Sequence, residues 1–211
     1  MAAPHKPAGW AVTLKREWDL RQLRDQRFRA LWAPPPAGEW VALATLASGR
    51  DKRRDRITAL AAVRIVGDRL LTSERLAWSA PPLAGSGGGS DGAPAPAPPD
   101  TATLQSWLDF IGSRPLVGYF LDFDLAMLDR ALRPLLGVAL PNPRIEVSAL
   151  FHGWKFRQLP PYQQQGNVTV DLRFATLLRE LGLPVRDAPG ALDRAVLAGL
   201  AWLKLRRLRA D

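Results

Sequence analysis

One stretch of the chain gathers side chains that suit contact with single-stranded nucleic acid. Residues 145–174, IEVSALFHGWKFRQLPPYQQQGNVTVDLRF, contain Lys155, Arg157, Tyr162 and three consecutive glutamines. Basic groups can bind phosphates, while aromatic rings and amides can stack on exposed bases or form hydrogen bonds with them. The alternative, which we prefer, is a structured connector between a strand and a helix. The same stretch contains His152, for which no acidic partner is evident, and we interpret it as a surface or packing histidine.

Two carboxylates, Asp122 and Asp124, lie in the run PLVGYFLDFDLAMLDRAL at residues 115–132. The pattern predicts a strand over 115–119 and a helix over 122–136, which places both acids in the first turn of that helix. The helix dipole favours negative charge there, so a capping role is the structural alternative to a role in chemistry.

The charge balance is strongly basic. The formal net charge is +9 and the isoelectric point is near 10.9, a balance that attracts polyanions such as nucleic acid. Only five of the 29 basic residues are lysine, and Ala, Pro and Gly are frequent, so a compositional bias is an equally good explanation. The absence of cysteine excludes disulfides and thiolate metal sites.

Length and hydropathy favour one globular domain. A chain of 211 residues can form a single domain with appendages, and it has no apolar run of the length that a transmembrane helix needs. The first residues, MAAPHKPAGWAVTLKR, lack the apolar segment of a secretory signal. We therefore expect a cytoplasmic location and no membrane association.

The first part of the domain is predicted to be a helix followed by an antiparallel meander. Residues 14–32 have apolar side chains, among them Leu14 and Trp18, at near-helical spacing, which predicts an amphipathic helix packed on the domain. Strands are predicted over about 40–46, 57–66 and 69–76, and Gly67-Asp68 has the composition of a two-residue hairpin turn.

The remainder alternates between strands and helices after a low-complexity segment. Residues 79–100 are rich in Pro and Gly and are predicted to be a linker. We expect a tail and packing helix at 1–36 and a domain at 37–208 that this linker interrupts. Beyond it, helices are predicted over 101–113, 122–136, 169–182 and 189–208, and strands over 115–119 and 144–148. The alternation predicts an α/β fold whose mixed sheet, an antiparallel meander plus parallel strands, is flanked by helices.

Three segments in this order resemble the DnaQ-like 3′-5′ exonuclease family, which includes polymerase proofreading subunits and RNase T. They are WVALATLASGRDKRRDRITALAAVRIVGDRLLTSERL at 40–76, the 115–132 run quoted above, and LRFATLLRELGLPVRDAPGALDRAVLAGLAWLKL at 172–205. The KFRQLPPYQQ run at 155–164 resembles one bacterial subgroup of that family. The resemblance implies a ribonuclease H-like fold and metal-assisted hydrolysis at the end of a nucleic-acid strand.

The resemblance also implies which positions would be catalytic, and most of them have changed. The family has Asp and Glu where this chain has Ala44 and Leu46, and His and Asp where it has Pro189 and Arg194, so that Asp124 alone is retained. One carboxylate does not hold two Mg²⁺ ions, so we expect no metal cofactor; if activity survives, Mg²⁺ or Mn²⁺ would be needed.

Two structural roles are predicted for these replacements. Arg194 could form an ion pair with Asp124 in place of the metal. Asp187 could cap the last helix, with Pro189 in its first turn. Asp193 is one position from Arg194, about 100° around the helix, and is not expected to point into the same site.

Three functions are consistent with these observations. The first is an exonuclease-family protein that is catalytically inactive but binds single-stranded nucleic acid, with Lys155, Arg157, Tyr162 and Arg194 as contact residues. The second is an active metal-dependent 3′-5′ exonuclease on DNA or RNA. The third is a protein-interaction module that binds a partner through its basic, Trp-rich surface. Whether the chain is an enzyme is therefore an open question at this point.

Overall fold

The computed structural model describes residues 9–81, 97–160 and 169–209, and its centre is one five-stranded sheet. The strands are β1 (Glu39–Ala47), β2 (Ile57–Val66), β3 (Arg69–Ser79), β4 (Leu116–Gly118) and β5 (Arg144–Glu146), in the spatial order β3-β2-β1-β4-β5. β1, β2 and β3 are antiparallel neighbours, whereas β4 is parallel to β1 and β5 is parallel to β4. The α/β fold with a mixed sheet is confirmed, and this strand order is that of the ribonuclease H-like architecture.

The antiparallel meander forms as the sequence predicts. Val66 pairs with Arg69 across the turn at Gly67-Asp68, and Gly67 adopts a φ of +59°, which glycine reaches without steric cost. The apolar run of β2 is buried over Leu60–Val63, as expected for a strand covered on both faces.

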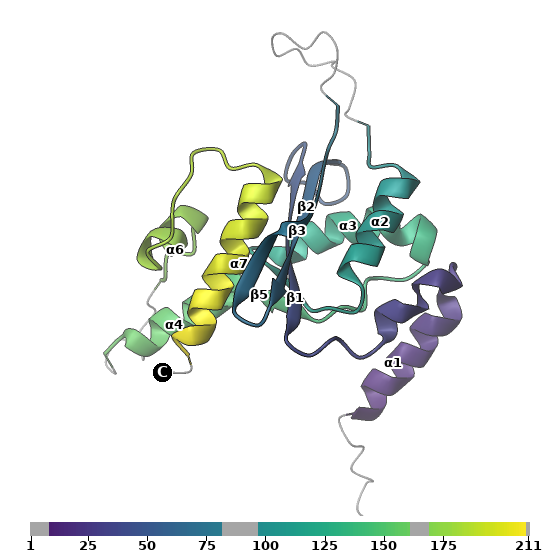
Figure 1. The fold of residues 1–211 in the computed structure, drawn as a ribbon, viewed down its shortest axis with the longest axis horizontal. Helices are drawn as coiled ribbons and strands as arrows, with labels where there is room; N and C mark the ends of the chain where they lie inside the picture. The colour runs from purple at the N-terminus through teal and green to yellow at the C-terminus, as the bar shows by residue number, and fades with distance from the viewer. Residues whose placement is uncertain (1–8, 82–96, 161–168, 210–211) are drawn as a thin grey trace, which may run out of the picture.

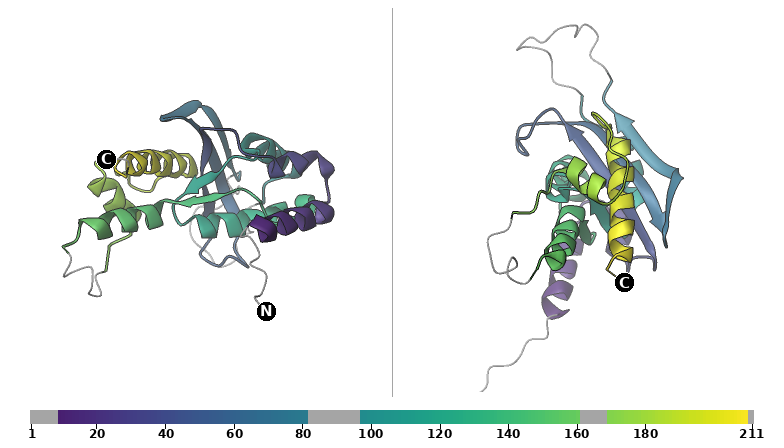
Figure 2. Two further views of the ribbon diagram at one scale, coloured as in Figure 1. Left: turned by 90° about the horizontal axis from the view of Figure 1, so that it is seen from below. Right: turned by 90° about the vertical axis from the view of Figure 1, so that its left-hand side faces the viewer.

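Helices cover both faces of the sheet (Figure 1). α2 (Thr101–Ile111), α3 (Leu121–Leu136) and the 3₁₀ helix η1 (Gln26–Trp32) contribute to the core on one face. α4 (Val147–Gln158), α6 (Phe174–Glu180) and α7 (Ala191–Arg207) contribute to the core on the other. Figure 2 shows the sheet between these two layers when the molecule is seen from below. α7 lies so close to the sheet that a Cβ atom at Gly199 would be 2.6 Å from a methyl carbon of Leu70.

The N-terminal helix differs from the prediction. Instead of one helix over 14–32, α1 (Gly9–Gln22) and η1 are separate, because the Arg24 amide donates to the Leu136 carbonyl and the Asp25 carboxylate accepts from the Arg27 amide. Leu14 and Trp18 are 52% and 64% exposed, so the expectation that they pack on the domain is wrong.

Two further segments depart from the predicted elements. The predicted strand 144–148 ends at Glu146, whose carboxylate accepts from the Ser148 amide and starts α4, a helix that the sequence reading missed. The predicted helix 169–182 is shorter, because Asp171 accepts hydrogen bonds from the Arg173 amide and the Thr176 hydroxyl before α6 begins.

The predicted linker can be followed only in part. β3 extends to Ser79, and residues 82–96 of the linker lie outside the described residues. Among the helices that the structure describes, none has the length and apolar character to cross a membrane.

Candidate functional site

A pocket of about 850 Å³ lies where the parallel strands end. Its lining includes Leu46 at the end of β1, Tyr119 and Phe120 directly after β4, Glu146 at the end of β5, and Arg194 of α7. In open α/β sheets, ligands bind in the crevice beyond the carboxyl ends of the strands. This pocket is therefore the candidate functional site.

Asp124 is the buried acid of the pocket. It lies in the first turn of α3 and is 5% exposed, and the Thr45 hydroxyl donates a hydrogen bond of 2.6 Å to its Oδ1 atom. Burial raises the pKa of the Asp124 carboxyl to about 6, against the opposing effects of the Thr45 hydrogen bond and the positive charge of Arg194. A carboxyl with such a pKa changes its charge close to neutral pH.

The partner of Asp124 on β1 was not predicted. The resemblance directs attention to Ala44 and Leu46, but Ala44 is buried in an apolar cluster with Ala61 and Ala195 and does not line the pocket. Thr45 points to the opposite face because side chains alternate along a strand, and that face is the one that α3 covers. The signal that could have identified it is the single hydroxyl residue within the apolar run at 40–47.

Glu146 was also missed, and it holds two helix starts together. Its carboxylate accepts from the backbone amides of Phe120 and Leu121, at 2.9 and 2.6 Å, where α3 begins. It also accepts from the amide and the hydroxyl of Ser148, where α4 begins. The amide groups at the start of a helix have no acceptor within the helix. The Glu146 carboxylate accepts hydrogen bonds from such amides at the start of both helices.

Tyr119 and Phe120 form an aromatic shelf at the pocket. Their rings meet edge to face with centroids 4.6 Å apart, and the Tyr119 hydroxyl donates to the Leu172 carbonyl at 2.6 Å. Burial raises the pKa of the Tyr119 phenol to about 12. Phe120 is 54% exposed although its φ is +51°, a left-handed conformation that is unfavourable for a side chain of this size. An exposed ring held in a costly backbone conformation is typical of a functional position.

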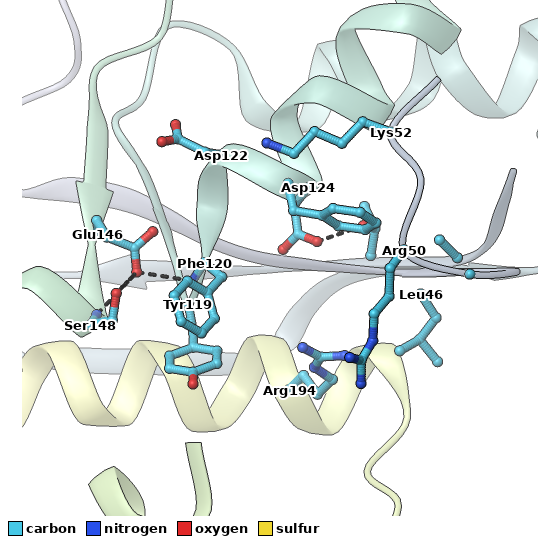
Figure 3. Close-up of a pocket in the computed structure, with 14 residues that line it drawn as sticks. Leu46, Arg50, Lys52, Tyr119, Phe120, Asp122, Asp124, Glu146, Ser148 and Arg194 are labelled. Atoms are coloured by element: carbon cyan, nitrogen blue, oxygen red, sulfur yellow. Dashed lines mark hydrogen bonds between the residues drawn. The ribbon is translucent and has the colours of Figure 1, made fainter. Parts of the chain in front are cut away.

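Three cations line the pocket: Arg50, Lys52 and Arg194. Figure 3 shows Arg194 entering from α7 and Arg50 from the loop after β1 into the same space, with Lys52 beside the first turn of α3. Within the described part of the chain, none of these three side chains forms a salt bridge with an acid. The cations therefore remain available to a ligand from solution.

The acids of the pocket, in contrast, are engaged. Asp122 is the most exposed of them and forms an ion pair with Arg144 at 3.4 Å. Asp124 binds Thr45, and Glu146 binds backbone amides.

Two expectations about the last helix are wrong. Arg194 and Asp124 line the same pocket, and the positive charge of Arg194 acts on the Asp124 carboxyl, but no salt bridge joins the two in the described structure. Asp187 does not cap α7: Gly190 occupies the N-cap position and makes no side-chain hydrogen bond, and Pro189 lies before it in a neighbouring apolar pocket. Asp193 is ion-paired with Arg186 at 2.7 Å, which agrees with its expected orientation away from the site.

The other predicted contact residues lie elsewhere. Lys155 is on α4 and is ion-paired with Glu180 at 2.6 Å, and Arg157 is exposed near the end of the same helix. Neither lines the pocket, and Tyr162 lies outside the described residues. Of the predicted nucleic-acid contacts, the structure places Arg194 alone in the pocket.

The donor set of the pocket does not fit a pair of divalent cations. Mg²⁺ and Mn²⁺ require several oxygen ligands, and a two-metal site requires a cluster of carboxylates. Within residues 9–81, 97–160 and 169–209, no group of three or more His, Cys, Asp or Glu side chains is placed to share a metal ion. Asp124 is the one acid that lies deep in the pocket, and a guanidinium from α7 lines the same pocket.

Comparisons with known proteins give similarity at the level of solved structures. No model of a known protein family matches the sequence, and no curated protein matches it. Among solved structures, the fold is similar to Brucella melitensis NrnC, with 17% sequence identity, a TM-score of 0.38, and coverage of 84% of this chain and 75% of that chain.

Proposed function

We propose that this chain is a degenerate relative of the DnaQ-like exonucleases that binds the end of a nucleic-acid single strand without hydrolysing it. The observation that supports this most is the set of three pocket cations, Arg50, Lys52 and Arg194, which have no acidic partner among the described residues. Cations that line a concave surface attract phosphate groups, and their contacts release counterions from the polyanion.

The aromatic shelf supports the same proposal, because its rings could stack on a base of the bound strand. A ring stacked on a nucleobase contributes about 1–3 kcal/mol and tolerates any base. Phe120 has the exposure that such a contact needs, and it shares the pocket with the three cations.

The pocket's chemistry argues against hydrolysis. At the family's first-strand positions the chain has Ala44 and Leu46, and the residue aligned with the last acid is Arg194. Asp124 would be the single ligand deep in the site, and its Oδ1 atom already accepts from Thr45. The fold and the motif order fit a nuclease scaffold. The side chains of the pocket fit binding of a strand end that carries phosphate.

Fluorescence anisotropy with labelled single-stranded DNA and RNA tests the binding. We expect binding at low salt, and Arg194→Ala should weaken it about tenfold, which corresponds to about 1.4 kcal/mol. Arg69→Ala is the matched control, because Arg69 is exposed at the start of β3, away from the pocket. Absence of binding at low salt would refute the proposal and favour a protein partner.

A nuclease assay tests the absence of hydrolysis. The labelled strands are incubated with Mg²⁺ or Mn²⁺ beside Asp124→Ala, and we expect no digestion by either protein. Metal-dependent shortening from the 3′ end that Asp124→Ala abolishes would show that the chain is an active exonuclease.

A further inference from the structure

The loop between β1 and β2 is strongly basic. Residues 48–56, SGRDKRRDR, which we call the basic loop, contain five cations and two acids. Arg50 and Lys52 belong to the pocket described above. The remaining cations, Arg53, Arg54 and Arg56, are exposed and do not line that pocket.

Both acids of the basic loop accept hydrogen bonds from groups within the loop. The Asp55 carboxylate accepts from the Ser48 hydroxyl at 2.8 Å and from the Asp51 amide at 2.6 Å. The Asp51 carboxylate accepts from the Arg53 amide at 2.8 Å and is 3.8 Å from the exposed Arg54 side chain. An exposed pair at that distance contributes little, so the positive charge of the loop faces outward with little compensation.

The loop is also fixed in place. A Cβ atom at position 49 would lie 2.6 Å from an Asp55 carboxylate oxygen, so Gly49 permits the tight packing of this turn. From α3, the Arg130 guanidinium donates to the carbonyl of Lys52 at 2.8 Å and to the carbonyl of Asp55. The cations are thus presented by a fixed backbone, which lowers the entropic cost of binding a ligand.

On its far side the basic loop borders a second groove of about 250 Å³. Four arginines line this groove, and no acid does: Arg53, Arg54, Arg56 and Arg130. The exposed Pro98 and the half-buried Ala131 supply apolar surface beside them. Arginines beside apolar side chains suit the phosphates and sugars of an unpaired strand, whereas an acidic peptide offers no sugar surface to the apolar residues.

We infer that the second groove binds the phosphodiester backbone of the same single strand whose end occupies the pocket. The inference rests on the proposed function and extends it: one loop presents two cations to the pocket and three to the groove. The strand therefore runs from the aromatic shelf across the basic loop towards α3, and the binding footprint is longer than one nucleotide.

A comparison of strand lengths tests this path by anisotropy. The triple variant Arg53→Ala, Arg54→Ala, Arg56→Ala should weaken binding of a strand of about ten nucleotides at least tenfold, and leave binding of a dinucleotide within about twofold. The salt dependence of the long strand, as log K against log salt, should become shallower by about 2, since a single strand contributes about 0.7 for each phosphate. A triple lysine variant at the same positions should retain the wild-type slope.

The matched control carries the same loss of charge elsewhere. Arg16, Arg21 and Arg69 are exposed and line neither the pocket nor the groove, so their triple alanine variant should change the slope little. Circular dichroism melting should show that both triple variants fold like the wild type. Equal losses of affinity in the two triple variants would overturn the inference. So would an equal loss of affinity for the dinucleotide and the long strand in the loop variant.

The outcomes separate this inference from the proposed function. If the wild type binds neither strand length, the proposed function fails. If Arg194→Ala weakens both lengths and the loop variant weakens neither, the proposed function stands and the groove is excluded. Competition by polyglutamate as effective as that by the strand, residue for residue, would show an acidic-peptide surface in place of a nucleic-acid path.

Discussion

The acidic and basic side chains of the pocket have different partners. Asp122, Asp124 and Glu146 come from the β5 and α3 side, and each is bound to a group of the protein: a guanidinium, a hydroxyl or backbone amides. Arg50 and Arg194 come from the loop after β1 and from α7 and have no acidic partner in the described structure. The difference teaches that the acids of this site are engaged by groups of the protein, whereas its cations are free to bind a ligand.

The largest effect is expected where an acid holds the fold. Glu146→Ala should lower the free energy of unfolding by about 3 kcal/mol, because two helix starts lose a cap and two partly buried amides lose their acceptor. Urea denaturation measures this change. Glu17→Ala is the control, since Glu17 is exposed on α1. A loss below about 1 kcal/mol would mean that Glu146 is not the structural acid that the geometry indicates.

The next effect concerns a cation and should leave the fold intact. Arg194→Glu should weaken strand binding about a hundredfold, since it removes an attractive charge and adds a repulsive one, about 2.7 kcal/mol in total. Arg194→Lys should retain most of the affinity. Anisotropy and a melting curve are measured together. A large drop in melting temperature would assign Arg194 to the fold and remove the contrast between the two sets of side chains.

The third prediction uses the raised pKa of Asp124. The folded state holds the proton up to about pH 6, compared with an ordinary carboxyl pKa of 3.8, so the protonated form stabilises the fold. This contribution is fully present below the ordinary pKa and is lost as the pH rises through about 6, with a magnitude on the order of 3 kcal/mol. Asp124→Asn should therefore flatten the dependence of stability on pH between about 4 and 7.

Urea denaturation at several pH values checks this prediction. The groups that act on Asp124 are Thr45, Arg194 and Glu146. An equal pH dependence in wild type and Asp124→Asn would place the titrating group elsewhere.

The smallest effect is expected for the exposed acid. The Asp122 side chain is 84% exposed and its ion pair with Arg144 spans 3.4 Å, so Asp122→Asn should change stability by less than about 0.5 kcal/mol. The variant should bind strands slightly more tightly at low salt, about twofold, because one negative charge leaves the pocket lining. A larger loss of stability would move Asp122 into the same class as Glu146.

The sheet could be predicted from the sequence because its signals are local. β1 and β2 coincide with apolar runs, and β3 continues from β2 through a turn at Gly67-Asp68, which has the composition that a hairpin requires. The end of α1 could not be predicted in this way, because it depends on a contact between Arg24 and Leu136, which are far apart in the chain.

A site residue could be predicted where a sequence motif identifies it. It could not be predicted where its role depends on contact with a residue far away in the chain. Asp124 was identified from its motif, and it does lie in the pocket. Thr45 and Glu146 were missed, because their roles arise from contacts with Asp124 and with the start of α3 that appear only once the strands are aligned. The prediction of an Arg194–Asp124 ion pair was wrong for the same reason, because the partner that a carboxylate binds depends on tertiary geometry.

Gly199 makes the pocket sensitive to a residue outside it. At this point α7 touches β1, β2 and β3, where a side chain would collide with Leu70, Ala42 and Ile65. Arg194 lies five residues earlier on the same helix, about 7.5 Å along its axis. A larger residue at position 199 would lift α7 from the sheet and displace the guanidinium with it. A library of random variants screened for lost binding should therefore yield substitutions of this glycine alongside those of the pocket itself.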